Sequence, residues 1–441
     1  MPKALRTLSF SFQNTHLTHF GGLVLLQRFC QTLGLRRCLQ RRVKVSQRNA
    51  DYAAADLILA LLYAIIAGLR RINKTQLLQS NGTFLDLLGL ERFPNETTLR
   101  RFLQRLPPQA IRQLAALHDG LRTQLFALPK LPSSLIFDLD SVVWTLYGHQ
   151  QGARLGYNPK KKGRRSYHPL LCFEAHRQEF WHGSLRPGDA SANTGVVFFL
   201  QRCLAKVPPS IARWRIRVRA DSGFFGGKFL ALLERLGLGY VIVAKEYRTI
   251  KSRAREARFQ RLANGFEAGE FYYQAHRWPK ARRFVVMRRP IPEDPAEAKQ
   301  LTLFKDRRYA CSVFVTNLGL APWRVWKFYR PRATVEKNVR ELLYDLPLAK
   351  IPSGDWLANV AFFQIVLFAY NLVHWFKRLC LPPQYGAATV ETVRTDFLLL
   401  PARLVSLAGR NVLQLPRDYP HQEAFVSAYK QASELRLPRK K

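Results

Sequence analysis

Four acidic residues in this chain lie where their carboxylates could bind a divalent cation. Asp138 and Asp140 stand two apart in an apolar, β-branched segment, so both side chains project from one face of a predicted strand. Asp221 ends a second such segment, at the strand end where open α/β sheets bind ligands. Glu336 lies one turn into a helix that Pro331 would begin. Carboxylate oxygens are the ligands that Mg²⁺ prefers, and two such ions can hold the attacking and leaving oxygens of a phosphoryl displacement.

Each of these acids also has an ordinary structural explanation. Asp140 could be a polar strand residue, Asp221 could begin a simple turn, and Glu336 could pair with Arg332 four residues earlier on the helix surface. The sequence has no Walker A loop, H-E-x-x-H pair or G-x-S-x-G elbow, so nothing in it favours a P-loop nucleotidase, a zinc peptidase or a serine hydrolase. The combination of acids on separate elements therefore favours metal-dependent phosphoryl transfer.

The net charge indicates the kind of partner. The 441 residues include 70 Lys and Arg against 30 Asp and Glu, a net charge of +40, and 47% of them are hydrophobic. The chain is therefore apolar enough to fold, and its positive surplus favours a polyanion, because released counterions drive such binding. Residues 1–50 contain no acid at all. This charge favours a nucleic acid as the partner, and an anionic membrane surface is the competing explanation.

Nothing in the sequence requires a membrane. Segment 356–376 has the length of a bilayer span, but it contains four polar side chains and the chain has no second good span. We therefore predict a helix buried in a soluble core and no membrane. The six cysteines form no C-x-x-C pair, and the first residues lack the apolar core of a signal peptide. We expect a cytoplasmic protein with reduced thiols.

Strand and helix patterns alternate over the part of the chain that carries the carboxylates, which predicts an α/β fold. A helical pattern precedes this part, and a strand-rich stretch interrupts it before long helices resume at about 331–380. These changes divide the chain into a helical, basic region at 1–130, a first core segment at 131–245, a strand-rich stretch at 246–328, a second core segment with the glutamate helix at 329–380, and a C-terminal region at 381–441.

Two basic segments are candidates for DNA contact. Asn95 would cap a helix that places Arg100 and Arg101 on its exposed face, as in the second helix of a helix-turn-helix, and an ordinary bundle helix is the alternative. The other segment lies between Tyr157 and Tyr167, and we interpret it as a DNA-contacting hairpin near the first aspartates, with a solvated loop as the alternative. Its cations are Lys160, Lys161, Lys162, Arg164 and Arg165.

Taken together, four motifs resemble those of bacterial insertion-sequence transposases of the DDE type. More narrowly, the chain is similar to the group that has a β-strand insertion between the second aspartate and the glutamate. The likeness covers nearly the whole chain. The motifs are Asp-Leu-Asp-Ser at 138–141, Gly-Tyr-Asn-Pro-Lys-Lys-Lys-Gly-Arg-Arg-Ser-Tyr-His-Pro-Leu at 156–170, Arg-Ala-Asp-Ser-Gly-Phe at 219–224 and Tyr-Arg-Pro-Arg-Ala-Thr-Val-Glu at 329–336.

This resemblance implies a ribonuclease-H-like catalytic core that is interrupted by a mainly β insertion and preceded by a helical region for DNA binding and dimerisation. It implies that Asp140, Asp221 and Glu336 bind two Mg²⁺ ions, for which Mn²⁺ would substitute. Asp140 is preferred because Ser141 follows it, as in the family, and Asp138 remains the alternative.

The family's signature Y-x₂-R-x₃-E-x₆-K is matched in part. Tyr329 and Arg332 take the tyrosine and arginine places, which implies contacts with backbone phosphates near the cleaved end. The lysine place holds Leu343, and Arg340 could supply the missing charge.

The resemblance implies a reaction as well. The enzyme would cleave double-stranded DNA at the ends of the element and join the freed 3′-OH ends to target DNA. A homodimer would hold the two ends. The protein would be located in the bacterial cytosol, in association with the nucleoid. Two alternatives stay open. One is a degenerate or domesticated copy that only binds DNA, and the other is a ribonuclease-H-like nuclease without strand transfer.

Overall fold

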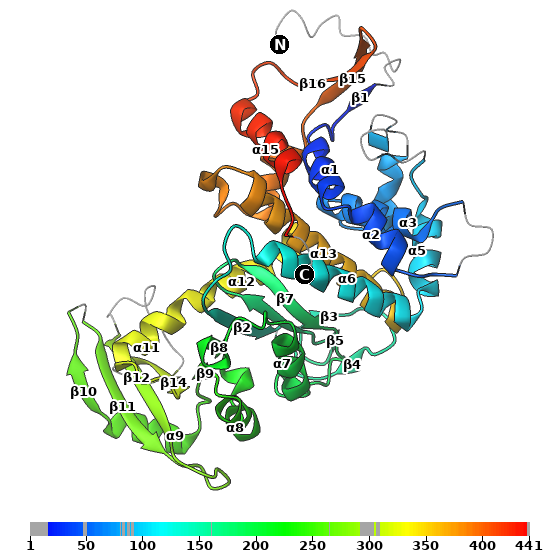
Figure 1. Ribbon diagram of the computed structural model, residues 1–441. Helices are drawn as coiled ribbons and strands as arrows, with labels where there is room; N and C mark the ends of the chain where they lie inside the picture. Colours follow the sequence, from blue (N-terminus) through cyan, green and yellow to red (C-terminus); the bar gives the residue numbers. More distant parts are fainter. Residues whose placement is uncertain are drawn as a thin grey trace, which may run out of the picture. The chain divides into compact units, whose positions relative to one another are not determined.

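The computed structural model describes residues 16–46, 51–79, 81, 84–85, 89, 92–159, 161–263, 265–291, 304–305 and 309–438 (Figure 1). The chain forms two compact units. The first consists of Met1–Leu125 with Glu341–Lys441, and the second is Phe126–Arg340. Residues 329–380, which the sequence analysis treats as one core segment, are therefore divided between the two units at Arg340. All three acids of the predicted triad belong to the second unit.

The second unit is built on a sheet whose central strands follow the predicted α/β alternation. Their order is β7-β6-β2-β8-β9. β2 runs parallel to β8, and β8 runs parallel to β9, whereas β6 is antiparallel to both β2 and β7. The strands are β2 (Leu135–Ser141), β6 (Leu170–Glu174), β7 (Glu179–Ser184), β8 (Ile216–Ala220) and β9 (Gly239–Val243).

Side-chain alternation along β2 explains why this strand can carry acids. Leu135, Phe137 and Leu139 are fully buried on one face, where they pack with helices α7 (Val196–Ala205) and α8 (Gly227–Arg235). Successive side chains of a strand point to opposite faces, so the acids of β2 lie on the other face.

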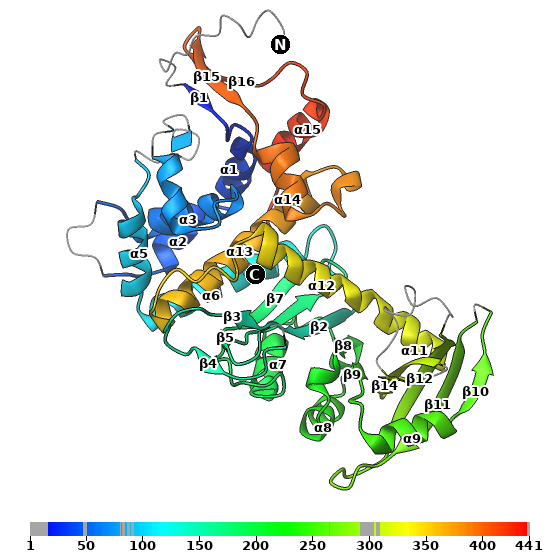
Figure 2. The same ribbon diagram turned by 180° about the vertical axis from the view of Figure 1, so that it is seen from behind.

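The strand-rich stretch of the chain extends the same sheet. β14 pairs with β9 antiparallel, and β12, β11 and β10 follow in order (Figure 2). Helix α11 packs over this part on the face opposite to α7 and α8, with Val325 completely buried. The elements are α9 (Arg248–Glu256), β10 (Arg258–Arg261), β11 (Glu267–Tyr273), β12 (Arg282–Pro290), β13 (Phe304–Lys305), β14 (Tyr309–Thr316) and α11 (Pro322–Tyr329).

A small separate sheet follows β2. Its strands are β3 (Trp144–Thr145), β4 (Arg154–Leu155) and β5 (Arg165–Tyr167), with β5 in the middle and antiparallel to both neighbours. The basic segment therefore connects β4 to β5.

The first unit is mainly helical, as its apolar runs predict. It also contains a small antiparallel sheet of β1 (Leu17–Thr18), β15 (Ala402–Leu407) and β16 (Arg410–Gln414). Its helices are α1 (Leu23–Thr32), α2 (Leu35–Arg42), α3 (Ala54–Ile66), η2 (Ile72–Leu78), α5 (Glu96–Arg105), α6 (Pro108–Phe126, the last residue beginning the second unit), α13 (Trp356–Cys380), α14 (Val390–Val393) and α15 (Gln422–Glu434).

Helix α13 is the apolar segment that raised the membrane question. Among the described residues it is the one helix long and apolar enough to cross a membrane, and 78% of its most apolar window is buried inside the protein. The predicted run of long helices at 331–380 is interrupted. The chain forms a 3₁₀ turn η5 (Arg330–Arg332), helix α12 (Ala333–Arg340) and a π-helical turn η6 (Glu341–Asp345), and then leaves the helical conformation. Pro347 and Pro352 lie in this break and lack the N–H that a helix interior needs.

Candidate active site

Asp140 and Asp221 lie side by side. The parallel pairing of β2 with β8 sets Leu139 opposite Ala220, so the next residues along the two strands are the two aspartates. Neighbouring strands lie about 4.8 Å apart. The Asp140 side chain is 14% exposed and that of Asp221 is 41% exposed. The register of the sheet thus brings together two of the three acids that the sequence singled out.

A buried arginine joins these two carboxylates. Arg332 Nη2 lies 3.2 Å from Asp140 Oδ1 and 3.9 Å from Asp221 Oδ2, and it donates a hydrogen bond to the Leu139 carbonyl at 3.1 Å. Burial alone would lower the pKa of Arg332, but Tyr329 and the surrounding aspartates raise it well above its usual value. Arg332 therefore carries a permanent positive charge, and the pairing with Glu336 that the sequence left open is replaced by this one.

The environment of Asp140 is unfavourable for a bare negative charge. The pKa of Asp140 is raised to about 6, chiefly by burial; the charge of Arg332 opposes this rise, and the charges of Asp221 and Glu336 contribute to it. A carboxylate in such a place binds its proton more tightly than usual, and a bound cation would likewise stabilise its negative charge.

Glu336 is less closely associated with the two aspartates. It lies on α12, whose Val335 and Val339 are buried, and its own side chain is exposed. It acts on Asp140 electrostatically. Within the described ranges, no group of three or more His, Cys, Asp or Glu side chains could hold a metal ion together. The structure thus assembles Asp140, Asp221 and Arg332, and leaves Glu336 outside that cluster.

Asp138 has a different partner. Both of its oxygens accept hydrogen bonds from Arg219, from Nε and from Nη2, each at 2.6 Å. The two side chains are 1% and 4% exposed. Arg219 Nη1 also donates to the Phe328 carbonyl at 2.8 Å. This ion pair crosses from β2 to β8 and attaches the end of α11 to the sheet, which fixes the segment that carries Arg332.

Tyr329 lies at the edge of the same cluster. Its ring packs against Phe314 with centroids 4.8 Å apart. Burial raises the pKa of Tyr329 to about 12, so its hydroxyl keeps its proton at neutral pH. Arg340 is exposed at the end of α12, and Leu343 lies in the π-helical turn that follows.

The basic segment has the predicted hairpin shape, because β4 and β5 are antiparallel. Lys161, Lys162, Arg164 and Arg165 are exposed, and Lys160 lies outside the described residues. Contact of this loop with DNA stays a prediction.

The predicted helix cap in the first unit is confirmed, since the Asn95 side chain accepts a hydrogen bond from the Thr98 N–H at 2.8 Å. Arg101 is exposed, as predicted. Arg100 is only partly so, because it donates to Glu96 at 2.7 Å and to the Pro352 carbonyl. Packing within the unit thus occupies one member of the basic pair.

The sequence did not suggest a role for two further residues near the aspartates, Arg219 and His168. Arg219 stands two residues before Asp221, which the sequence shows, but its pairing with Asp138 depends on the register of β2 against β8. His168 is 5% exposed, and burial lowers its pKa while the charge of Asp221 acts in the opposite direction. The lowered pKa makes His168 neutral at physiological pH.

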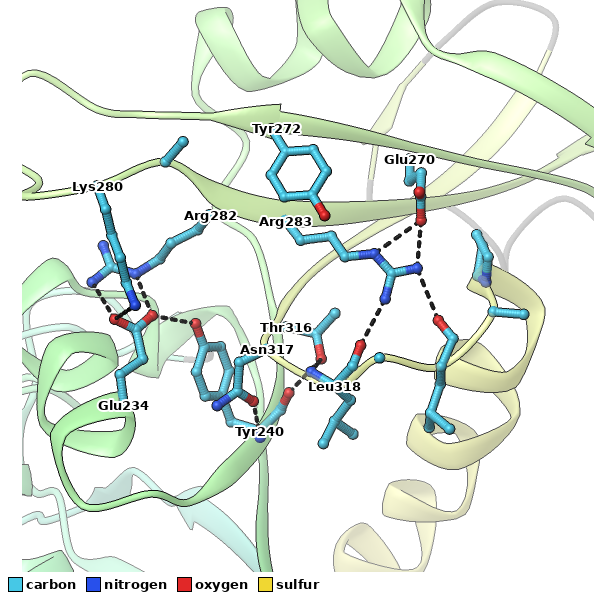
Figure 3. Close-up of a pocket in the computed structure, with 15 residues that line it drawn as sticks. Glu234, Tyr240, Glu270, Tyr272, Lys280, Arg282, Arg283, Thr316, Asn317 and Leu318 are labelled. Atoms are coloured by element: carbon cyan, nitrogen blue, oxygen red, sulfur yellow. Dashed lines mark hydrogen bonds and ion pairs between the residues drawn. The ribbon is translucent and has the colours of Figure 1, made fainter. Parts of the chain in front are cut away.

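A pocket of about 560 Å³ opens elsewhere in this unit, where β12 begins and β14 ends (Figure 3). Its charged side chains bind one another: Arg282 contacts Glu234 at 2.7 Å, and Arg283 contacts Glu270. None of the three acids of the predicted triad lines it. The pocket is therefore not the site of the predicted chemistry.

Comparisons with known proteins place the chain in a family. Residues 2–437 match the family described as transposase DDE domain group 1. Among solved structures, it is similar to the piggyBac transposase in a synaptic complex with hairpin DNA (11% identity, TM-score 0.44, covering 82% of this chain and 75% of that one). It is also similar to the Drosophila P element transposase in a strand transfer complex (14% identity, TM-score 0.24, covering 51% and 49%). No curated protein matches this sequence.

Because the family match spans nearly the whole sequence, the chain belongs to the DDE transposases of this group. It is a transposase, an enzyme that cleaves DNA and carries out its transposition. DDE transposases have a ribonuclease-H-like core and generally use divalent metal ions. The predicted mixed α/β fold is confirmed.

Proposed function

We propose that this transposase cleaves DNA at the ends of a bacterial insertion sequence and joins the freed 3′-OH ends to target DNA, with Asp140, Asp221 and Glu336 as the catalytic triad. One observation carries the proposal: Asp140 and Asp221 are adjacent on parallel strands and share a buried guanidinium. The ion pair of Asp138 with Arg219 supports Asp140 as the first ligand, because it already engages both oxygens of Asp138.

The donor set fits a hard divalent cation, since it consists of carboxylate oxygens alone. Asp140, Asp221 and Glu336 would hold two Mg²⁺ ions, or Mn²⁺ in their place, and Glu336 would have to approach the aspartates for this. When bound, such ions polarise the phosphate and stabilise the attacking and leaving oxygens. The raised pKa of Asp140 supports the assignment, because its site favours a positive neighbour.

The other residues of the cluster would position the scissile phosphate. Arg332 carries a permanent charge and is held by the Leu139 carbonyl, so it would orient a phosphate oxygen beside the aspartates. Tyr329 keeps its proton and would donate a hydrogen bond to the same phosphate. Arg340 and the β4–β5 loop would bind the DNA backbone further away, since they are exposed and basic.

Further parts of the proposal concern the whole protein. The strands from β10 to β14 would be an insertion in the ribonuclease-H-like core, which is supported by their position at one side of the sheet, between β9 and the glutamate helix. The helical region 1–130 would bind DNA and help to form a homodimer that holds both ends of the element. The protein would act in the bacterial cytosol, next to the nucleoid.

A joining assay tests the proposed function. The purified protein is mixed with labelled DNA carrying the sequences that flank its gene, a target plasmid and Mg²⁺. Joined products support the proposal, cleavage without joining indicates a nuclease, and binding without cleavage indicates a copy that only binds DNA. Asp140→Asn, Asp221→Asn and Glu336→Gln should abolish both steps, whereas the exposed-acid controls Asp418→Asn and Glu423→Gln should keep them.

A further inference from the structure

A strongly basic segment follows β9 and takes no part in the site described above. Residues 245–261 contain seven Lys and Arg against two Glu. They comprise the linker after β9, helix α9 and strand β10. The cations are Lys245, Arg248, Lys251, Arg253, Arg255, Arg258 and Arg261.

Helix α9 directs this charge towards solvent. Ile250 and Ala254 are buried and anchor one side of the helix. Arg248 and Arg255 lie seven residues apart, which is two turns or about 10 Å along the helix, and both are exposed. Because its apolar side is already packed, α9 offers no apolar face to a membrane surface.

The two glutamates of the segment are engaged by their neighbours. Glu246 lies 2.7 Å from Lys251 Nζ. Glu256 accepts a hydrogen bond from Ser252 at 2.8 Å and lies 3.9 Å from Arg253. With these contacts inside it, the segment keeps a net charge of 7 − 2 = +5.

The segment begins at the same edge of the sheet as the catalytic aspartates. β2, β8 and β9 are parallel, so their carboxyl ends share one edge. Ala220 pairs with Ile242, which sets Asp221 level with Val243 and places Lys245 two residues beyond it. β9 is the second strand from β2, so Lys245 starts about 10 Å from Asp140 across the sheet.

An aromatic contact confirms this placement. The Tyr247 ring lies 6.1 Å from that of Phe225, in the loop that follows Asp221. Tyr247 is nevertheless 52% exposed. The linker into α9 therefore packs directly against the loop that carries the second aspartate, and it presents an exposed aromatic ring there.

We propose that residues 245–261 form a second DNA-contacting surface, here called the edge patch, which binds duplex backbone on one side of the catalytic aspartates. The basic β4–β5 loop belongs to the small sheet whose strand β5 leads directly into β6, and β6 pairs with β2 on the side away from β8 and β9. A duplex would cross the sheet edge between the two. This inference rests on the proposed function of the aspartates and identifies how their DNA substrate is held.

The test compares two double variants that remove the same charge. Arg248→Gln/Arg255→Gln removes two cations of the edge patch. Arg213→Gln/Arg215→Gln removes two exposed cations just before β8, at the opposite edge of the sheet. Binding of a labelled duplex is measured by fluorescence anisotropy at several salt concentrations in EDTA, with thermal unfolding as a control for folding.

Each phosphate contact contributes about 0.9 to the slope of log K against log salt concentration. The edge-patch variant should therefore lower the slope by about 2, the control should leave it unchanged, and Arg248→Lys/Arg255→Lys should restore most of it. Equal slopes for wild type and the edge-patch variant overturn the inference, as does an equal fall in both double variants. Since EDTA prevents cleavage, failure of the proposed chemistry would show in the joining assay and not here.

Discussion

The same substitution should destabilise the protein to very different extents at the two aspartates of β2. In the wild-type protein, Arg219 donates to both charged oxygens of Asp138 at 2.6 Å. Asp138→Asn replaces these two acceptors by one neutral amide oxygen, while the Arg219 guanidinium stays buried. Removing one partner of a buried ion pair costs about 3–5 kcal/mol, and the remaining amide oxygen places the expected loss near the lower end, at about 3 kcal/mol.

Asp140→Asn should cost much less. Its one ion pair is longer, at 3.2 Å, and Arg332 keeps the Leu139 carbonyl as an acceptor. We expect a change below about 1 kcal/mol in the free energy of unfolding.

Calorimetric unfolding in EDTA at pH 7.5 measures the difference. For a unit of this size about 2–4 °C correspond to 1 kcal/mol, so Asp138→Asn should lower the transition temperature by roughly 6–12 °C. Removing both partners in Asp138→Asn/Arg219→Gln should recover part of this loss, because no buried charge is then left alone. Equal stability of Asp138→Asn and wild type, or a larger loss in Asp140→Asn, would refute the assignment of structural and catalytic roles.

Three further outcomes follow from the described contacts. Burial raises the pKa of Glu174 to about 7, so its contribution to stability is complete below pH 4.5 and is lost as the pH rises through about 7. Glu174→Gln should remove that loss, which is on the order of 3 kcal/mol of unfolding free energy. If the unfolding free energies of wild type and Glu174→Gln, measured with urea, changed equally between pH 4 and pH 8, this prediction would be wrong. Arg332→Gln should raise the pKa of Asp140 further, because the opposing charge is gone, and a carboxyl NMR titration in EDTA that shows no rise would exclude the pairing. Arg100→Ala should cost about 1 kcal/mol of unfolding free energy and Arg101→Ala less than about 0.5, as measured by urea denaturation, since Arg100 alone bonds within the unit; equal effects would count against that difference.

Local patterns explain what the sequence predicted well. The β-branched runs and their alternation identified β2, β8 and the strand-rich stretch, and Asn95 identified the start of α5. These features depend on neighbours within a few residues, which a single sequence displays directly.

Sheet register and distant contacts explain what it could not predict. The alternation places Asp138 and Asp140 on one face of β2. Only the pairing of β2 with β8 shows that Arg219 lies opposite Asp138 and forms an ion pair with it. The hydrogen bond from Arg100 to the Pro352 carbonyl joins residues 252 positions apart, so no local sequence pattern predicts it. The break after α12, by contrast, had a visible signal in Pro347 and Pro352.

The catalytic role of Asp140 is tested most directly by the single-turnover rate of DNA cleavage by Asp140→Asn, measured in Mg²⁺ beside wild type and Asp418→Asn. The affinity of each protein for the same duplex is measured as well. Asp140→Asn should bind DNA as wild type does and should not cleave it, while Asp418→Asn should do both. Cleavage by Asp140→Asn at the wild-type rate would contradict the claim that the paired aspartates of β2 and β8 form the active centre.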